Sequence, residues 1–243
     1  MKYILAIRLM AAFLFLTLVA LPGCSRIGSS INGSGALVDQ DIRLTGFTGI
    51  NITGPFQADI IQTDAFQVIV NTDENLVNRI ESSLNDQILV IGIKAPGSFF
   101  PTSLKLKIGM PRIYTLQLAG GAKASLSGFK STFNLSVVLA EASILNGTLD
   151  AGNCDFDLSE SSQINLTGSA LGLDLTASDA SKINLENFNV NIAKLYLKQN
   201  SEATLNLNGR TDVRLENAST VYYVGNPVFN DTSISGGSFM KHK

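Results

Sequence analysis

The pattern of apolar and polar residues between Leu118 and Leu215 repeats six times. Each copy contains a short apolar run that ends in leucine, a polar or small turn, one small residue and a second short apolar run. The leucines are Leu118, Leu139, Leu158, Leu175, Leu197 and Leu215, and the small residues are Ala122, Ser143, Ser162, Ser181, Ser201 and Ser219. The five intervals between the leucines average about 19.4 residues. This period is too short for repeats of paired helices, and it predicts an all-β parallel β-helix, or solenoid, with coils of about 20 residues.

The spacing of apolar residues inside the repeat predicts which side chains are buried. In Leu173-Asp174-Leu175 and Leu195-Tyr196-Leu197 the leucines are two positions apart, so they share one face of a strand. We expect these leucines to form a continuous interior, with Asp174 and Tyr196 facing outwards. The small residue of each copy, such as Ser181, also has inward parity, which allows the chain to bend without crowding the interior.

Short alternating segments before the repeat predict further strands. They are bounded by glycine, proline and aspartate and include Ile50–Ile52, Phe56–Ile60, Phe66–Val70, Gln87–Ile93 and Leu104–Ile108. One helix is expected at Asp73–Leu84, where apolar residues lie three or four positions apart and acidic residues stand at the start. A loop is expected at residues 96–101.

Residues 1–23 have the features of a secretory signal peptide, because an apolar run from Leu9 to Leu21 follows two basic residues and is too short to span a membrane. The segment ends in Leu21-Pro22-Gly23-Cys24, which resembles the bacterial lipobox, so Cys24 is predicted to be lipidated. The alternative is an ordinary cleaved signal followed by an incidental cysteine. Ser25 replaces the aspartate that often retains lipoproteins at the inner membrane, so the resemblance favours the outer membrane. Residues 24–34 are predicted to form a flexible Gly/Ser-rich tether.

Charge and cysteine content narrow the classes of partner. Removal of residues 1–23 leaves 16 basic and 20 acidic residues and a net charge of −4, which argues against nucleic acid as a partner. If Cys24 is acylated, Cys154 has no partner for a disulfide. Its neighbours Asp155 and Asp157 are acidic, so we expect a buried, unreactive thiol.

The sequence supports neither a metal site nor a catalytic site, and it indicates no cofactor. Asp150, Asp155, Asp157 and Glu160 form the densest acidic cluster, but calcium needs six to eight oxygen ligands and no EF-hand loop or glycine-rich nonapeptide is present. We expect this cluster to be a solvated strand face. The single histidine, His242, is expected in a frayed C-terminal tail, where it could not serve as a catalytic base.

Two pairs of aromatic residues are candidates for contact with a ligand or partner. Phe99 and Phe100 fall in the predicted loop before Pro101 and are the better candidates for a binding surface that stacks on sugars or proteins. Tyr222 and Tyr223 stand near the end of the repeat. For both pairs, capping an open end of the solenoid is the alternative role.

An ordered set of short motifs resembles the family called putative auto-transporter adhesin, head GIN domain. The motifs are Gly33-Ser34-Gly35, Gly46-Phe47-Thr48-Gly49-Ile50, Gly54-Pro55-Phe56-Gln57-Ala58, Thr72-Asp73-Glu74-Asn75-Leu76, Ala119-Gly120-Gly121-Ala122, Tyr223-Val224-Gly225-Asn226-Pro227 and Ser235-Gly236-Gly237-Ser238. The resemblance covers residues 35–240 and implies a right-handed parallel β-helix in an exported, often lipid-anchored bacterial protein. It implies no catalytic residues.

Two functions remain open on the sequence. The first is a non-enzymatic, lipid-anchored envelope protein that presents its β-helical surface for adhesion or interaction with the cell envelope, with envelope glycans or proteins as candidate partners. The second is a polysaccharide lyase or hydrolase that uses carboxylates such as Asp155, Asp157 or Asp174. The basic residues of the repeat do not recur beside the acidic ones in the sequence, which favours the first function. The surface or periplasmic orientation and the oligomeric state are left open.

Overall fold

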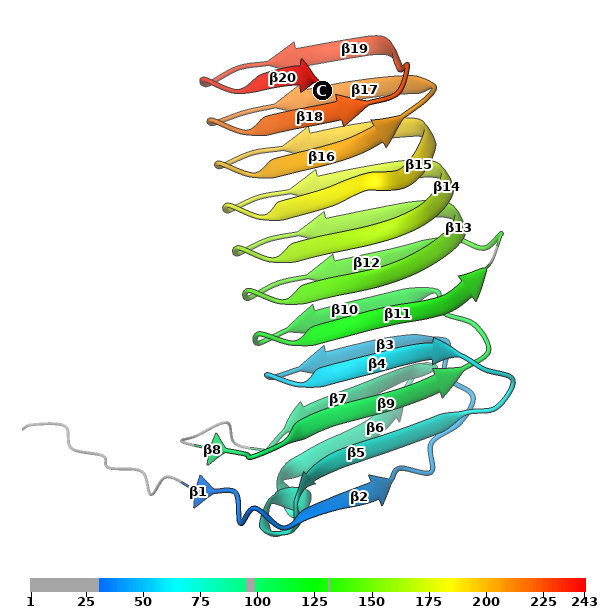
Figure 1. The fold of residues 1–243 in the computed structure, drawn as a ribbon, viewed down its shortest axis with the longest axis vertical. Helices are drawn as coiled ribbons and strands as arrows, with labels where there is room; N and C mark the ends of the chain where they lie inside the picture. Colours follow the sequence, from blue (N-terminus) through cyan, green and yellow to red (C-terminus); the bar gives the residue numbers. More distant parts are fainter. Residues whose placement is uncertain (1–30, 95–98, 131) are drawn as a thin grey trace, which may run out of the picture. The chain divides into compact units, whose positions relative to one another are not determined.

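The computed structural model describes residues 31–94, 99–130 and 132–243, and residues 31–243 form one compact unit. The unit is a flattened parallel β-solenoid with two facing sheets, and each coil contributes one strand to each sheet (Figure 1). The predicted signal peptide, Cys24 and the first residues of the predicted tether lie outside the described residues. Within the part of the chain that is described, no helix has the length and apolar character needed to cross a membrane.

The first sheet contains the strand that precedes each tight turn. Its parallel strands, from the N-terminal end of the solenoid onwards, are β7 (Ile88–Ile93), β3 (Gly49–Thr53), β10 (Thr115–Ala119), β12 (Leu135–Leu139), the second halves of β13 (Ile144–Leu158), β14 (Gln163–Ala177) and β15 (Lys182–Leu197), then β17 (Arg210–Leu215) and β19 (Val228–Ile234).

The second sheet contains the strand that follows each tight turn. Its parallel strands, in the same direction, are β9 (Leu104–Met110), β4 (Gln57–Gln62), β11 (Lys123–Lys130), the first halves of β13, β14 and β15, then β16 (Glu202–Leu207), β18 (Thr220–Val224) and β20 (Phe239–His242).

The coils do not all stack in sequence order. The coil formed by β3 and β4 lies between the coil of β7 and β9 and the coil of β10 and β11. From β10 onwards each coil adds to the preceding one. Successive strands stay in register over long runs, as Ile144 opposite Gln163 and Leu158 opposite Ala177 show, with local register shifts between some pairs, such as β14 and β15. The predicted β-solenoid is therefore confirmed, and simple sequential stacking holds only for the repeat.

Antiparallel strands close the N-terminal end of the solenoid. β5 (Gln67–Asp73) pairs with β9, β2 (Leu37–Asp41) pairs with β5, and β6 (Ile80–Asn85) pairs with β7. The helix predicted at Asp73–Leu84 is wrong, because only a 3₁₀ helix at Glu74–Arg79 is present and the chain then extends into β6. Ile80 and Leu84 are four positions apart, a spacing that fits both a helix and alternate positions of a strand.

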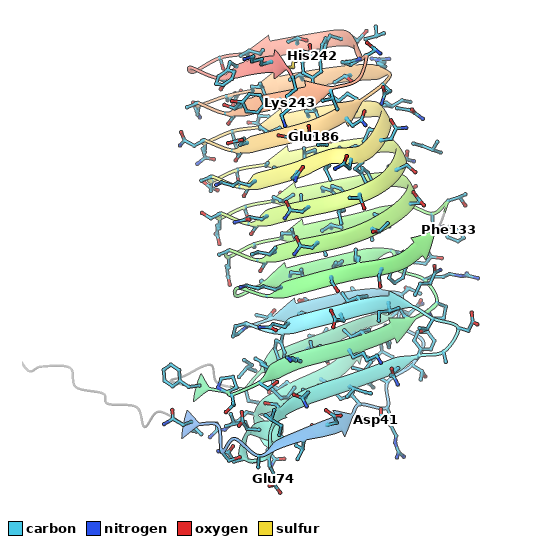
Figure 2. The ribbon with its side chains drawn as sticks, in the orientation of Figure 1. Asp41, Glu74, Phe133, Glu186, His242 and Lys243 are labelled. Atoms are coloured by element: carbon cyan, nitrogen blue, oxygen red, sulfur yellow. The ribbon has the colours of Figure 1, made fainter. Side chains whose placement is uncertain are left out.

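Two further segments differ from their predicted conformation. Phe99–Phe100 is strand β8 rather than a loop, and it pairs in parallel with β1 (Ile31–Asn32), so residues at the end of the predicted tether belong to a small sheet. His242 lies in β20 opposite Tyr223 and is not part of a frayed tail. The neighbouring Lys243 forms an ion pair with Glu186, with 3.0 Å between Nζ and Oε2 (Figure 2).

The predicted strand parity is confirmed by burial. Leu175 and Leu197 are buried in the interior, whereas Asp174 faces solvent and Tyr196 is partly exposed. The small residues of the repeat are also buried and form one column, as predicted: Ala122, Ser143, Ser162, Ser181, Ser201 and Ser219. Cys154 is buried as expected, and desolvation raises the pKa of its thiol to about 12.

From β10 onwards, each tight turn contains two consecutive residues with positive φ, as in a type I′ turn. Glu141 and Ala142 have φ of 56° and 60°, and the next coil repeats the geometry at Glu160 and Ser161. The turns are joined in a ladder, because the second residue of one turn donates its N–H to the carbonyl of the first residue of the next turn, for example Ala142 to Glu160 at 2.9 Å. These bonds offset the cost of the left-handed conformation for residues other than glycine.

Candidate functional site

An open groove of about 800 Å³ lies on the outer surface of the first sheet, near the edge where the long strands bend from one sheet to the other. We call it the Phe133 groove. Residues that line it include Tyr114, Phe133, Asn153, Asp174, Ile192 and Lys194. They come from several successive coils, because equivalent positions on stacked strands are adjacent in space.

One wall of the Phe133 groove is apolar and aromatic. The rings of Tyr114 and Phe133 meet edge to face with 5.5 Å between their centroids, and the guanidinium carbon of Arg112 lies 5.7 Å from the centre of the Phe133 ring. These contacts fix the Phe133 ring although 48% of the residue is exposed (Figure 2). Ile192 is also exposed on this surface. The wall is therefore a preformed apolar platform.

The other wall carries polar side chains in register. Ser136, Asp155, Asp174 and Lys194 occupy equivalent outward positions on successive strands. Lys194 Nζ lies 3.8 Å from Oδ2 of Asp174. Asn153 extends the polar wall, because both its backbone N–H and its side-chain amide donate to Asn134 Oδ1, at 3.1 and 3.2 Å.

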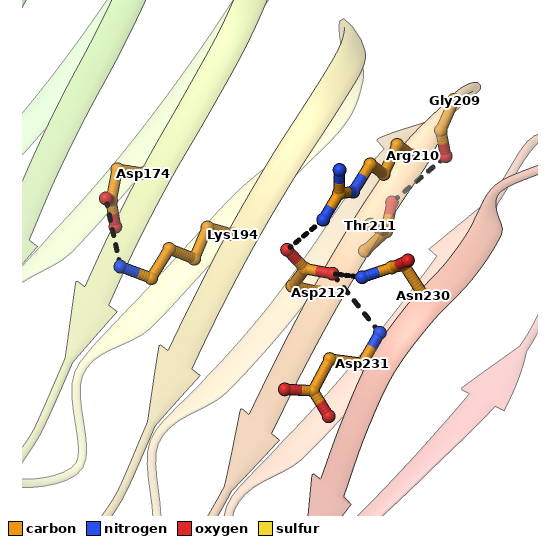
Figure 3. A network of polar contacts seen from close by, with 8 residues as sticks. All are labelled: Asp174, Lys194, Gly209, Arg210, Thr211, Asp212, Asn230 and Asp231. Carbon is orange, nitrogen blue, oxygen red and sulfur yellow. Dashed lines mark hydrogen bonds and ion pairs between the residues drawn. The ribbon is translucent and has the colours of Figure 1, made fainter.

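The polar column continues towards the C-terminal end of the solenoid (Figure 3). Asp212 follows Lys194 in register, and its carboxylate lies 3.6 Å from Nη2 of Arg210. The same carboxylate accepts hydrogen bonds from the side-chain amide of Asn230 at 2.9 Å and from the backbone N–H of Asp231 at 3.2 Å. A second open hollow of about 480 Å³ follows this column and shares Asp174 and Lys194 with the Phe133 groove.

Tyr196 lines the second hollow within a group of charged residues. Its hydroxyl donates to Glu216 Oε2 at 3.1 Å, and the guanidinium of Arg214 lies 5.0 Å from its ring centre. Arg214 also forms an ion pair with Glu216 at 2.6 Å. The hydrogen bonds from Arg214 and then Tyr196 hold the pKa of the Glu216 carboxyl below its ordinary value. The aromatic ring at this end of the surface is thus held in one orientation, as Phe133 is at the other.

The predicted acidic residues do not form a metal site within the described part of the chain. Asp155 and Asp157 are exposed on the first sheet, as predicted, and no group of three or more potential ligands is present among the described residues. Basic residues do not recur beside the acidic ones in the sequence, but the fold brings some of them together. Lys194 lies next to Asp174, and Arg210 lies next to Asp212. These charges pair in the open, where water screens them.

The aromatic residues chosen from the sequence do not build the groove. Phe100 is exposed on β8 and lies outside the Phe133 groove, which contains Phe133 instead. The sequence feature that could have indicated Phe133 is the greater length of the coil that contains it. This coil brings Thr115 on β10 opposite Ser136 on β12, a wider separation along the chain than in the later coils, where Ile144 lies opposite Gln163. One extra residue lies in the irregularity between Leu126 and Phe129 of β11, and another lies in the connection between β11 and β12 that contains Phe133.

A separate polar centre fixes the N-terminal segment. Asp73 is fully buried, and its carboxylate accepts the backbone N–H groups of Gly35 and Thr102, each at 2.7 Å. Burial raises the pKa of the Asp73 carboxyl. The hydrogen bonds from Gly35, Thr102 and Ser103 together lower this pKa by more than burial raises it, so it lies below the ordinary value of 3.8. Asn75 holds the same segment, because its side chain donates to Asn32 O and accepts from Ser34 N–H. These hydrogen bonds connect the motif Gly33-Ser34-Gly35 with the motif Thr72-Asp73-Glu74-Asn75-Leu76.

Comparison with known proteins identifies a family that matches most of the described unit. The family described as "Putative auto-transporter adhesin, head GIN domain" matches residues 46–227. No curated protein matches the chain.

Solved structures share the fold at low identity. A putative adhesin from Bacteroides fragilis NCTC 9343 has a TM-score of 0.82 and 17% identity, over 88% of this chain and 100% of that chain. A putative lipid binding protein from Parabacteroides distasonis ATCC 8503 has a TM-score of 0.70 and 16% identity, over 88% of this chain and 99% of that one. A putative adhesin from Parabacteroides merdae ATCC 43184 has a TM-score of 0.68, 16% identity and the same coverage.

Proposed function

Since the chain belongs to the family described as "Putative auto-transporter adhesin, head GIN domain", we propose that it is a non-enzymatic envelope protein that binds glycans through the Phe133 groove and is held to the outer membrane by lipid on Cys24. The observation that carries the proposal is the open groove with an aromatic platform on one wall and a ladder of polar side chains on the other.

The chemistry of the two walls matches that of a sugar chain. Sugar rings have apolar C–H faces that pack on aromatic rings, and their hydroxyl groups bind the amide and carboxylate groups of side chains such as Asn153 and Asp174. The Phe133 ring is already positioned by Tyr114 and Arg112, so little side-chain entropy is lost on binding. The groove is open and crosses several coils, which suits a polymer better than a small enclosed ligand.

The lipid anchor rests on the segment Leu21-Pro22-Gly23-Cys24 after an apolar run. Only seven residues, counted from Cys24, precede Ile31, the first residue of β1. A fully extended chain covers at most about 3.6 Å per residue, so these residues reach about 25 Å. With Cys24 in the bilayer, β1 would remain close to the membrane surface.

Binding without catalysis follows from the environment of the carboxylates. General acid–base catalysis uses carboxyl groups held in a desolvated site beside the substrate. Asp155 and Asp174 stand on an open strand face, and Asp174 is paired with Lys194. The groove therefore suits recognition of a glycan better than its cleavage.

The test is binding of the mature Cys24→Ser chain to immobilised bacterial envelope polysaccharides. We expect saturable binding that falls at least about tenfold in Phe133→Ala, since hot-spot aromatic residues contribute at this level. The matched control is Phe100→Ala, which removes another exposed phenylalanine outside the groove. No binding to any glycan, or equal loss in the two variants, would reject the proposal.

A further inference from the structure

The two ends of the solenoid differ in how they terminate. At the N-terminal end, antiparallel β2 and β6 are the outermost strands, and they carry Asp39, Asp41 and Glu81. At the C-terminal end, the last coil consists of β19 and β20. Within the described residues β19 pairs only with β17, and β20 pairs only with β18. Each last strand therefore has one edge of backbone N–H and carbonyl groups without a neighbouring strand (Figure 1).

The apolar interior is open at this C-terminal end. Ile234 occupies the same inward column as Leu215, yet it is 42% exposed whereas Leu215 is completely buried. Thr232 and Met240, opposite the buried Val213 and Val221, are exposed and partly exposed. Val228 and Phe239, at outward positions of the same coil, are 67% and 46% exposed. In every preceding coil of the repeat, the next coil covers this end surface, whereas in the last coil the same type of surface faces solvent.

The exposed coil is held in a fixed conformation. Tyr223 packs edge to face against Phe229 at 5.4 Å and against His242 at 5.0 Å, and Tyr222 does so against Phe239 at 5.9 Å. His242 Nε2 lies 3.2 Å from the carbonyl of Gly225. An aromatic cluster on a preorganised edge is the composition found at the centre of protein interfaces.

We propose that the C-terminal end of the solenoid pairs with the same end of a second copy of this chain, with β19 of each copy antiparallel to β20 of the other. β19 and β20 run in opposite directions within one coil. A two-fold axis parallel to the strands brings each strand opposite the other strand of the second copy, antiparallel to it. Both sheets then continue across the junction, and the interface closes as a dimer.

Charge complementarity supports this arrangement. Asp231 lies five residues before Gly236, and Lys241 lies four residues after Gly237, both on outward positions of the last coil. The two-fold axis places the turns of both copies at the same end, so Asp231 of one copy and Lys241 of the second copy differ in position by about one residue, or 3.3 Å. The dimer has two such pairs. Stacking onto the N-terminal end with both sheets continued would instead bring β19, which carries Asp231, towards β6, which carries Glu81.

The size of the end surface predicts a weak dimer. The seven residues of β19 span about 23 Å. Two sheets about 10 Å apart with their outer side chains are about 20 Å thick, so the two end surfaces together bury about 900 Å². Interfaces of this size belong to weak complexes, and we expect a dissociation constant in the range of about 1 to 100 µM.

This inference deepens the proposed function and rests on it for its biological meaning. With the lipid anchor at the N-terminal end, pairing of C-terminal ends would join copies anchored in facing membranes. Several weak junctions between two membranes act together, so a micromolar contact suffices for adhesion.

The test is sedimentation of the mature Cys24→Ser chain from 1 to 500 µM, with charge reversals at the junction. We expect reversible dimers for the parent chain and at least about tenfold weaker association for Asp231→Lys and for Lys241→Glu alone, because each places like charges opposite one another. An equimolar mixture of these two variants should recover dimers, since both pairs are then complementary. The double variant should recover them as well.

The matched control carries Asp157→Lys and Lys182→Glu, which reverse exposed charges on a central coil. It should dimerise like the parent, and equal melting temperatures show that all variants are folded. A chain that stays monomeric to 500 µM, that forms oligomers beyond dimers, or whose two variants fail to complement each other overturns the proposal. Phe133→Ala should dimerise normally, so loss of glycan binding and loss of pairing are distinguished.

Discussion

The backbone N–H of Gly35 donates a 2.7 Å hydrogen bond to the carboxylate of Asp73, which lies 38 residues later in the chain. The other oxygen of the same carboxylate binds Thr102 N–H at 2.7 Å. One buried side chain thereby ties the segment after β1, the end of β5 and the segment before β9. The lowered pKa of Asp73 means that the folded state favours its ionised form.

The first prediction follows from this linkage. Asp73 contributes its full stabilisation above its ordinary pKa of 3.8, and this contribution is lost as pH falls through the lower pKa of the folded state. Asp73→Asn should lower the melting temperature at pH 7 on the order of 5 °C. The difference from the parent chain should shrink below about pH 4. A difference that does not change between pH 7 and pH 3 in thermal melts would contradict this linkage.

The second prediction concerns strand parity. Leu197→Asp should destabilise the domain by at least about 2 to 5 kcal/mol, because it removes a buried leucine and places a charge in the interior. Tyr196→Ser is the control at the adjacent outward position, where it removes partly exposed contacts with Lys198, Arg214 and Glu216. Urea unfolding measures both, and equal losses of stability would disprove the assignment of faces.

The repeat was predictable because three local signals agree there. Leucines two positions apart define the inward face, a small residue such as Ser181 marks the bend, and the period sets the stacking. The strand at the N-terminal end was not predictable, since Ile80 and Leu84 are four positions apart and fit both the helical and the strand pattern. The segment is a strand because it pairs with β7. No local feature of the sequence predicts that long-range contact.

The site was predictable only in part, because it depends on register. Asp174 and Lys194 become neighbours because an irregularity between Asn165 and Gly168 shifts the register of β14 on β15. Without this shift, the register that aligns Asn165 with Asn184 would continue and would place Ala193 opposite Asp174. The sequence therefore predicts the outward face of Asp174 but not its ion pair with Lys194.

The third prediction compares two equivalent serines of the buried column. Ser181 Oγ donates a 2.7 Å hydrogen bond to Ser178 O, whereas Ser162 Oγ has no partner in the structure. Ser181→Ala should cost about 0.5 to 1.5 kcal/mol. Ser162→Ala should be neutral or stabilising, because it removes a buried hydroxyl without a partner. Denaturant unfolding of both variants decides, and an equal cost would show that the two hydroxyls have equivalent surroundings.

The fourth prediction concerns the anchor at Cys24. Cys24→Ser should abolish incorporation of labelled palmitate and leave the protein either unprocessed, with its signal segment retained, or soluble, since acylation needs the thiol. One chain of myristate length binds membranes only marginally, so stable attachment requires several chains. Cys154→Ser is the control, because that thiol is buried within the solenoid. Membrane retention of Cys24→Ser with undiminished label would refute the anchor.

The last prediction is that the domain does not cleave polysaccharides. Asp155 and Asp174 face the Phe133 groove, but they stand in solvent. Among the residues that the structure describes, the only cationic side chain in register with them is Lys194, which is paired with Asp174. A lyase or hydrolase needs a carboxyl or basic group that is desolvated against the substrate and able to transfer a proton.

The purified chain should therefore release no reducing ends and no unsaturated products from acidic or neutral polysaccharides, with or without Ca²⁺. Binding to the same polysaccharides should persist under these conditions. Turnover that disappears in an Asp155→Asn/Asp174→Asn double variant, but persists in Asp157→Asn, would establish the groove as an active site. Asp157 is the suitable control because it lies on the same outer face and outside the groove.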